Sequence, residues 1–218
     1  NRLLLIGNDV STKYTKRGED MYERYARYIR QTALAKRGNY IAFFPSYRFM
    51  ENVCDAFMKL PGEQIPAVMQ APYMSEEERE IFLENFEEER AGSLVGFCVM
   101  GGIFSEGIDL TADRLIGAAI VGTGIPQVCT ERELIRQFFD RMGMSGFDFA
   151  YLYPGMNKVL QSAGRVIRTE EDKGVILLLD DRFLGRRYRE IFPREWSGYQ
   201  ICNLNEVTKI TEKFWKGK

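Results

Sequence analysis

The sequence contains no histidine among its 218 residues. Ser-His-Asp triads, Cys-His nucleophiles and HExxH zinc sites are therefore excluded. Four cysteines, Cys54, Cys98, Cys129 and Cys202, are scattered along the chain without a CxxC pair. This spacing is typical of reduced, mostly buried thiols and disfavours a zinc or iron–sulfur site built from these four residues. We predict no metal site in this chain.

Long hydrophobic runs are also lacking. The longest apolar stretches, such as LIGAAIVG and VILLL, are far shorter than the roughly 20 residues that a membrane-spanning helix needs. The chain does not open on a signal peptide either. Together with the reduced cysteines, these features predict a cytoplasmic protein without membrane contact.

A loop that could enclose a triphosphate is missing as well. The pattern GxxxxGK[ST] does not occur, and the sole Gly-Lys pair is the terminal Gly217–Lys218. The dipeptide Asp-Glu, which would provide an acidic metal box, never appears. Such elements supply most ground-state phosphate and Mg²⁺ contacts in nucleoside triphosphatases. Any nucleotide site formed by this chain is therefore predicted to be half of a site.

The charge balance is close to neutral, since the formal net charge is −1. This argues against a strongly basic nucleic-acid-binding protein. Residues 1–157 carry 17 Lys or Arg against 22 Asp or Glu, whereas residues 158–218 carry 13 against 9. An anion-binding surface is therefore expected to draw on the C-terminal part.

Short apolar segments alternate with amphipathic ones along the chain, whose hydrophobic content is 45%. The predicted strands cover residues 39–44, 67–70, 94–102, 115–122, 174–179 and 199–202. The predicted helices cover residues 18–37, 47–60, 76–90, 130–139, 155–168, 185–192 and 205–216. This alternation predicts an α/β fold with a doubly wound, mainly parallel sheet and helices on both faces. We expect one domain over residues 1–218, with the long opening helix packed on the edge of this domain.

Two capping boxes are predicted to open helices. Ser75 with Glu78 would begin the acidic helix over residues 76–90, and Thr130 with Glu133 would begin the helix through Phe139. GTGIPQ, after the strand at 115–121, lacks the third glycine of a dinucleotide fingerprint and predicts a strand-to-loop turn.

Three segments are candidates for chemistry, and we expect all three at the carboxyl ends of strands, where ligands bind in such sheets. In FFPSYRFMEN, Ser46 precedes a helix and could be a plain N-cap or could hold a phosphate. In MGGIFSEGIDL, the glycines allow close backbone approach, and Glu106 and Asp109 could contact a ribose or a basic partner, or could be solvated acids.

The third segment is QSAGRVIR, residues 161–168. On a helix, Gln161, Gly164, Arg165 and Arg168 would line one stripe, opposite the apolar anchors of the same segment. A solvated helix face is the alternative, but a mid-helix glycine beside two arginines favours an anion site.

Taken in order, IAFFPSYRFMENV, GGIFSEGIDL and QSAGRVIR resemble motifs IV, V and VI of superfamily 2 helicases, and more narrowly those of the XPD/DinG family of DNA helicases. The resemblance covers about residues 20–215 and includes DDRF after the strand at 174–179. It implies a RecA-like fold and the role of a second, C-terminal motor domain. ATP with Mg²⁺ would bind between this domain and an N-terminal motor domain in cis.

The resemblance also implies roles for single residues. Arg165 and Arg168 would be arginine fingers, which are worth about 10³–10⁵ in rate, with Gln161 near the γ-phosphate. Nucleotide-binding residues would be Glu106, Gly107, Asp109 and Gly164. Single-stranded DNA would meet Ser46, Tyr47 and Ser105.

The family's first motor domain carries the P-loop and, in most members, an iron–sulfur cluster, so a cluster is implied for the parent protein and not for this chain. Translocation would run 5′ to 3′. We expect the isolated fragment to be inactive. Two other functions stay open from the residues: a non-catalytic nucleic-acid-binding or interaction module that retains the fold, and a small-molecule nucleotide enzyme. The missing phosphate-cradling loop disfavours the second of these.

Overall fold

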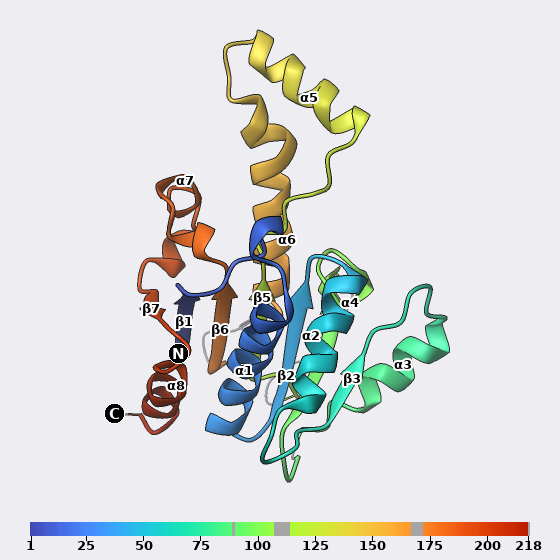
Figure 1. Ribbon diagram of the computed structural model, residues 1–218, viewed down its shortest axis with the longest axis vertical. Coiled ribbons are helices and arrows are strands. Elements are labelled where there is room, and N and C mark those ends of the chain that lie inside the picture. The colour runs from blue at the N-terminus through green and yellow to red at the C-terminus, as the bar shows by residue number, and fades with distance from the viewer. Residues whose placement is uncertain (89, 107–113, 167–171, 218) are drawn as a thin grey trace.

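The computed structural model describes residues 1–88, 90–106, 114–166 and 172–217. Its strands form one seven-stranded sheet with the order β3-β4-β2-β5-β6-β1-β7, in which every neighbouring pair is parallel (Figure 1). The strands are β1 (Arg2–Gly7), β2 (Asn39–Phe44), β3 (Ala67–Met69), β4 (Leu94–Val99), β5 (Gly117–Val121), β6 (Gly174–Leu179) and β7 (Gln200–Cys202). The predicted parallel α/β sheet is confirmed.

The helices connect these strands. They are α1 (Glu19–Ala35), α2 (Tyr47–Lys59), α3 (Glu76–Glu84), α4 (Ile103–Glu106), α5 (Thr130–Arg141), α6 (Tyr153–Ala163), α7 (Arg186–Arg189) and α8 (Val207–Trp215). Shorter helical turns are η1 (Tyr14–Lys16), η3 (Asp148–Leu152), η4 (Asp181–Leu184) and η5 (Arg194–Trp196).

Both faces of the sheet are buried, which explains the continuous apolar strands in the sequence. Along β2, Tyr40, Ala42 and Phe44 belong to the cluster that packs against α1, α2 and α8. Ile41 and Phe43 belong to the opposite cluster, which packs against α3, α4 and α6. Because successive strand residues point to opposite faces, each strand serves both layers.

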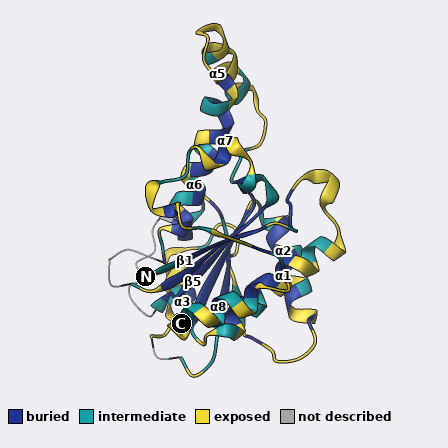
Figure 2. Ribbon diagram, turned by 90° about the vertical axis from the view of Figure 1, so that its left-hand side faces the viewer, coloured by how far each residue is buried: buried dark blue, intermediate teal, exposed yellow. Residues whose placement is uncertain are grey.

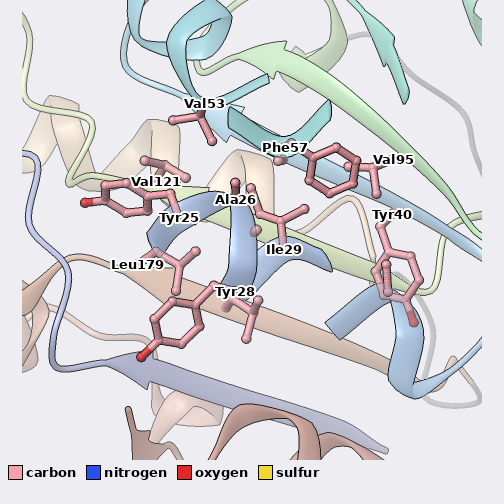
Figure 3. Packing of buried hydrophobic residues seen from close by; sticks show 14 of the residues in the cluster. Tyr25, Ala26, Tyr28, Ile29, Tyr40, Val53, Phe57, Val95, Val121 and Leu179 are labelled. Atoms are coloured by element: carbon pink, nitrogen blue, oxygen red, sulfur yellow. The ribbon is translucent and has the colours of Figure 1, made fainter. Parts of the chain in front are cut away.

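α1 packs on a face of the sheet as part of the core, so the expectation that it lies on the edge of the domain is wrong. Its residues Tyr25, Tyr28 and Ile29 are almost completely buried. Figure 3 shows them packed over Val121 of β5 and Leu179 of β6. A helix with this much apolar surface gains more by covering the middle of a sheet than by lining its edge.

Several predicted boundaries differ from the structure. β1 was not predicted, because the short run RLLLIG acquires its pairing from β6 and β7, which are distant in sequence. The Ser75–Glu78 capping box is confirmed, but its helix ends at Glu84 and not at residue 90. The second capping box is wrong: Cys129 is the N-cap of α5, without a side-chain capping bond, and Thr130 is already helical. The basic helix at 185–192 is a single turn, Arg186–Arg189.

α5 is the most solvent-exposed of the longer helices and projects beyond the carboxyl ends of the strands (Figure 1). None of its residues is buried, and Figure 2 shows this end of the molecule as largely exposed. It is held by η3, through stacking of Phe139 on Phe149, whose ring centroids are 4.0 Å apart. The sheet core therefore does not depend on this projection.

Candidate functional site

One group of polar residues gathers where β2, β3 and β4 end. We call Ser46, Tyr47, Gln70, Gly101 and Lys158 the carboxyl-edge cluster. Ser46 caps α2: its hydroxyl oxygen accepts a hydrogen bond from the backbone N–H of Phe49 at 3.3 Å. The N-cap prediction is confirmed, while a phosphate contact by the same residue stays a prediction.

Gln70 joins the loops of this cluster, although the sequence did not single it out. Its side-chain amide nitrogen donates to the Tyr47 hydroxyl at 3.0 Å, and its carbonyl oxygen accepts from the backbone N–H of Val99 at 2.9 Å. Gln70 is only 2% exposed. A polar residue at the end of a short apolar strand was the available signal in the sequence.

The glycine turn after β4 completes the cluster. Gly101 has a φ of 73°, in the left-handed region that favours glycine. A β-carbon at this position would lie 3.0 Å from Cε of Lys158, so the lysine stem from α6 lies directly over the turn. The cluster therefore combines a hydroxyl, a cation and a side-chain-free stretch of backbone.

Ser105, on the short helix α4, is fully buried. Its hydroxyl donates to the carbonyl oxygen of Gly102 at 2.8 Å, and its own carbonyl oxygen accepts from Nε of Arg165 at 2.9 Å. A DNA contact by Ser105 stays a prediction, and in this structure its hydroxyl is engaged inside its own loop. The residue instead links the second and third candidate segments.

A second group lies at the C-terminal end of α6, and we call Gln161, Gly164 and Arg165 the α6 end. The predicted helix through residue 168 is wrong in its boundary, because α6 ends at Ala163 with Gly164 as C-cap. Beyond it the backbone tightens: the N–H groups of Arg165 and Val166 bond to carbonyls three residues back. Gly164 is therefore a helix terminator.

The α6 end has exposed residues on one side and buried residues, which pack into the core, on the other. Gln161 and Gly164 are exposed and Arg165 is half-buried, whereas Ala163 and Val166 are 2% and 4% exposed. Among the described residues, a β-carbon on Gly164 would meet only the carbonyl oxygens of Leu160 and Gln161, at 3.2 and 3.6 Å. No other described element therefore covers the backbone at this glycine.

The two groups lie at opposite ends of the strands. α6 begins against the carboxyl end of β5, where Gly124 and Gly155 come so close that a β-carbon on Gly124 would lie 2.4 Å from the carbonyl oxygen of Gly155. At the other end, Gly164 borders a hollow of about 230 Å³ together with Arg2, which pairs with the first residue of β6. The expectation that all three segments lie at the carboxyl ends is wrong for the α6 end, because a crossover helix runs back to where the next strand starts.

Some predicted site residues lie outside the described residues. These are Gly107, Asp109 and Arg168, together with the side chain of Glu106, whose backbone closes α4. Their assignment to the nucleotide remains a prediction.

A buried charged network at the ends of β6 and β1 was not predicted. Asp180 is fully buried and receives two hydrogen bonds from the Arg182 side chain, at 2.7 and 2.8 Å. It also accepts from the backbone and hydroxyl of Thr12, at 2.9 and 2.8 Å. Burial by itself would raise the pKa of Asp180, but the bonds from Arg182 and Thr12 outweigh it and hold this pKa below its usual range. The network fastens the loop after β1 to the sheet.

All four cysteines are free, with Cys98 and Cys202 buried, Cys54 half-buried and Cys129 exposed. Among the described residues, no group of three or more His, Cys, Asp or Glu side chains could hold a metal ion. None of the helices in the part of the chain that the structure describes is long and apolar enough to cross a membrane.

Comparison with known proteins identifies relatives for this fold and these segments. Residues 29–199 match the family described as Helicase C-terminal domain. The chain is 29% identical over 182 residues to the ATP-dependent DNA helicase XPD of Sulfolobus acidocaldarius, a match that covers 82% of this chain and 31% of that protein. It is 30% identical over 150 residues to the ATP-dependent DNA helicase DinG of Photobacterium profundum, covering 68% of this chain and 21% of that protein.

The fold has a solved counterpart. A structure of apo XPD superposes with a TM-score of 0.76 at 23% identity, covering 93% of this chain and 40% of that one. The chain therefore spans less than a third of the length of these two curated relatives and has the RecA-like fold of the solved XPD domain. With the family match over most of the chain and the three motif segments on this fold, the protein belongs to the helicase C-terminal domain family, in its XPD/DinG branch.

Proposed function

We propose that residues 1–218 form a single domain that acts as the C-terminal motor domain of an ATP-dependent DNA helicase. In this proposal the α6 end faces an ATP site that an N-terminal motor domain in cis completes. The carboxyl-edge cluster forms part of a single-stranded DNA track. The names of the relatives, both of them ATP-dependent DNA helicases, support this assignment.

The observation that carries the proposal is the hydrogen bond from Arg165 Nε to the carbonyl oxygen of Ser105. It joins the motif VI arginine to the motif V segment across 60 residues of chain. An arginine finger acts by neutralising charge on the transferred phosphoryl group, and it does so best when its guanidinium is oriented beforehand. A backbone carbonyl that holds Nε provides such an orientation.

The residues at the α6 end fit a nucleotide that enters from outside. Gln161 and Gly164 are exposed, and the lack of a side chain at Gly164 lets a phosphate approach the backbone closely. ATP with Mg²⁺ would supply the phosphoryl group and part of its charge neutralisation. Arg165, Arg168 and Gln161 would contact the γ-phosphate side, with Glu106, Gly107 and Asp109 nearby. The P-loop and the metal-holding carboxylate would come from the N-terminal domain.

The carboxyl-edge cluster fits a phosphate backbone. A single-stranded nucleic acid is bound by hydroxyls, backbone N–H groups, cations and aromatic faces, and this edge offers Ser46, Tyr47, the Gly101 turn and Lys158. We further propose 5′-to-3′ translocation in the parent helicase. An iron–sulfur cluster, where the parent carries one, belongs to its remaining domains.

The test compares the isolated chain with the full-length parent. The isolated chain should show no ATP turnover with or without single-stranded DNA, and the parent should show DNA-stimulated turnover. The isolated chain should bind a labelled oligonucleotide weakly, with log affinity falling by about 0.7 per contacted phosphate for each unit of log salt. A parent that binds DNA but never hydrolyses ATP would make this chain a non-catalytic binding module.

A further inference from the structure

Gln70 is buried at the carboxyl edge, and both ends of its side-chain amide are used. The oxygen accepts from the backbone N–H of Val99, and the nitrogen donates to the hydroxyl oxygen of Tyr47. Its own backbone N–H donates to the carbonyl oxygen of Phe97 at 2.8 Å. The residue is therefore fixed at three points between the ends of β3 and β4.

These bonds decide which way the amide points. A backbone N–H can only donate, so the group that faces Val99 must be the amide oxygen. The NH₂ group then faces Tyr47, whose hydroxyl acts as the acceptor. Among the described residues, none accepts a hydrogen bond from the Tyr47 hydroxyl. Tyr47 thus keeps its proton available to an acceptor from outside.

The surroundings of Tyr47 suit an anionic acceptor. Val99 leads directly into the turn at Gly101 and Gly102, and a β-carbon on Gly102 would lie 3.2 Å from the Gln70 amide nitrogen. Lys158 lies over the same turn, and it forms no ion pair among the described residues. The glycine turn therefore has a cation over Gly101 and, through the amide of Gln70, a hydroxyl group connected to it at Gly102.

We propose that Gln70 is a positioning residue for nucleic-acid binding, which holds the Tyr47 hydroxyl with its proton directed at a backbone phosphate of single-stranded DNA. Through Val99 it also fixes the glycine turn against which that phosphate lies. This inference rests on the proposed DNA track. It adds that Gln70 determines whether the Tyr47 hydroxyl donates its proton towards the DNA or towards the protein. Gln70 itself does not touch the DNA.

The test uses Gln70→Glu, which keeps the shape and reverses the polarity. The carboxylate still accepts from Val99 but now also accepts from Tyr47, so the tyrosine proton turns inward. In the full-length parent without nucleotide, at about pH 8, affinity for a single-stranded oligonucleotide should fall about tenfold or more, the size typical of a lost hydrogen bond to a charged group. Tyr47→Phe should lose a similar factor.

Acidification provides a readout that structural damage would not produce. Burial disfavours the charged form of a carboxyl group, and lowering the pH shifts Q70E towards its protonated form. The new O–H donates to Tyr47 as the glutamine does, so the affinity of Q70E should recover towards that of the wild type as the pH is lowered. Lys158, the cation beside the turn, keeps its charge throughout this change.

The outcomes separate this inference from the proposed function. If Tyr47→Phe binds DNA as the wild type does, the DNA contact of Tyr47 fails. If Tyr47→Phe weakens binding but Q70E does not, or if the Q70E loss persists at acid pH, the positioning role is overturned. Should Q70E not fold, Gln70→Met removes both bonds at similar volume. It must then lower affinity in the wild type but not in the Tyr47→Phe background, and an equal loss in both would refute the proposal.

Discussion

The carboxyl-edge cluster and the α6 end are built in different ways. At the carboxyl edge, Gln70 is buried and hydrogen-bonded, Ser46 caps a helix and the turn at Gly101 is fixed beneath Lys158. At the α6 end, Gln161 and Gly164 are exposed, and Nε of the half-buried Arg165 donates to the backbone carbonyl of Ser105. The first region is organised within this chain, whereas the second presents groups outward.

This difference agrees with the two functions that we propose, DNA binding at the carboxyl-edge cluster and ATP hydrolysis at the α6 end. A surface that binds a flexible strand benefits from groups held in place beforehand, since less ordering free energy is lost on binding. A finger that serves a site shared between two domains needs access, and its contribution appears only when the other domain closes on it. Substitutions should therefore separate the regions by what they change.

The largest effect is expected at the α6 end. In the full-length parent, Arg165→Ala should lower kcat by about 10³-fold or more, because charge on the γ-phosphoryl group loses a positioned cation. Arg165→Lys should restore little, since a point charge does not replace a planar fork. DNA affinity and melting temperature should stay near those of the wild type, as the side chain is not part of the core.

Arg186→Ala is the matched control for Arg165→Ala. It removes an arginine whose side chain is 88% exposed and whose ion-pair partner is Glu190, and it should leave kcat unchanged. Steady-state kinetics, DNA titration and thermal melting of all three variants decide the matter. An Arg165→Ala variant that melts ten degrees lower but keeps its turnover would make that arginine structural.

The next effect concerns stability at the carboxyl ends of the strands. Asp180→Ala should lower the free energy of unfolding by about 3–5 kcal/mol, because it leaves Arg182 without its buried partner. Gln161→Ala, at the exposed α6 end, should change it by less than about 0.5 kcal/mol. Urea unfolding of both variants measures the two values. Equal losses would contradict the contrast between the hydrogen-bonded carboxyl ends of the strands and the exposed α6 end.

Lowering the pH should reduce the contribution of Asp180 to the stability of the folded protein. The pKa of Asp180 is lower in the folded protein than in the unfolded chain. Its ionisation therefore stabilises the fold above the unfolded pKa of about 3.9, and this contribution is lost as the pH falls through the folded pKa. The stability difference between the wild type and Asp180→Asn should shrink from pH 7 towards pH 3 in urea unfolding. A difference that grows on acidification would reverse the assigned sign.

The smallest expected effect separates the two roles of Ser46. Ser46→Ala should cost about 1 kcal/mol of stability through the lost cap. Ser46→Asp retains a good cap but brings a negative charge, so stability should stay near wild type while DNA affinity drops. Thermal melting and oligonucleotide titration of both variants give the answer. If Ser46→Asp binds DNA normally, Ser46 is a plain helix cap.

The strands and the family were predictable from local patterns in the sequence. The apolar runs of β2 and β6 predicted buried parallel strands, and the order of the three motif segments predicted the family that the comparison confirmed. The end of α6 was not predictable from periodicity, since Val166 continues the apolar pattern after the helix has stopped at Gly164. Local patterns record which face is buried more reliably than where a helix ends.

The sequence by itself determined the residue types of this protein: strands apolar on both faces, a helix capped by Ser46, and an arginine that follows a glycine in QSAGRVIR. Tertiary structure alone decided which groups meet. The bond between Ser105 and Arg165 spans 60 positions, that between Tyr47 and Gln70 spans 23, and the pairing of Thr12 with Asp180 spans 168. Such contacts depend on strand order in the sheet, and strand order is set by burying two apolar faces at once, which no local stretch of sequence encodes.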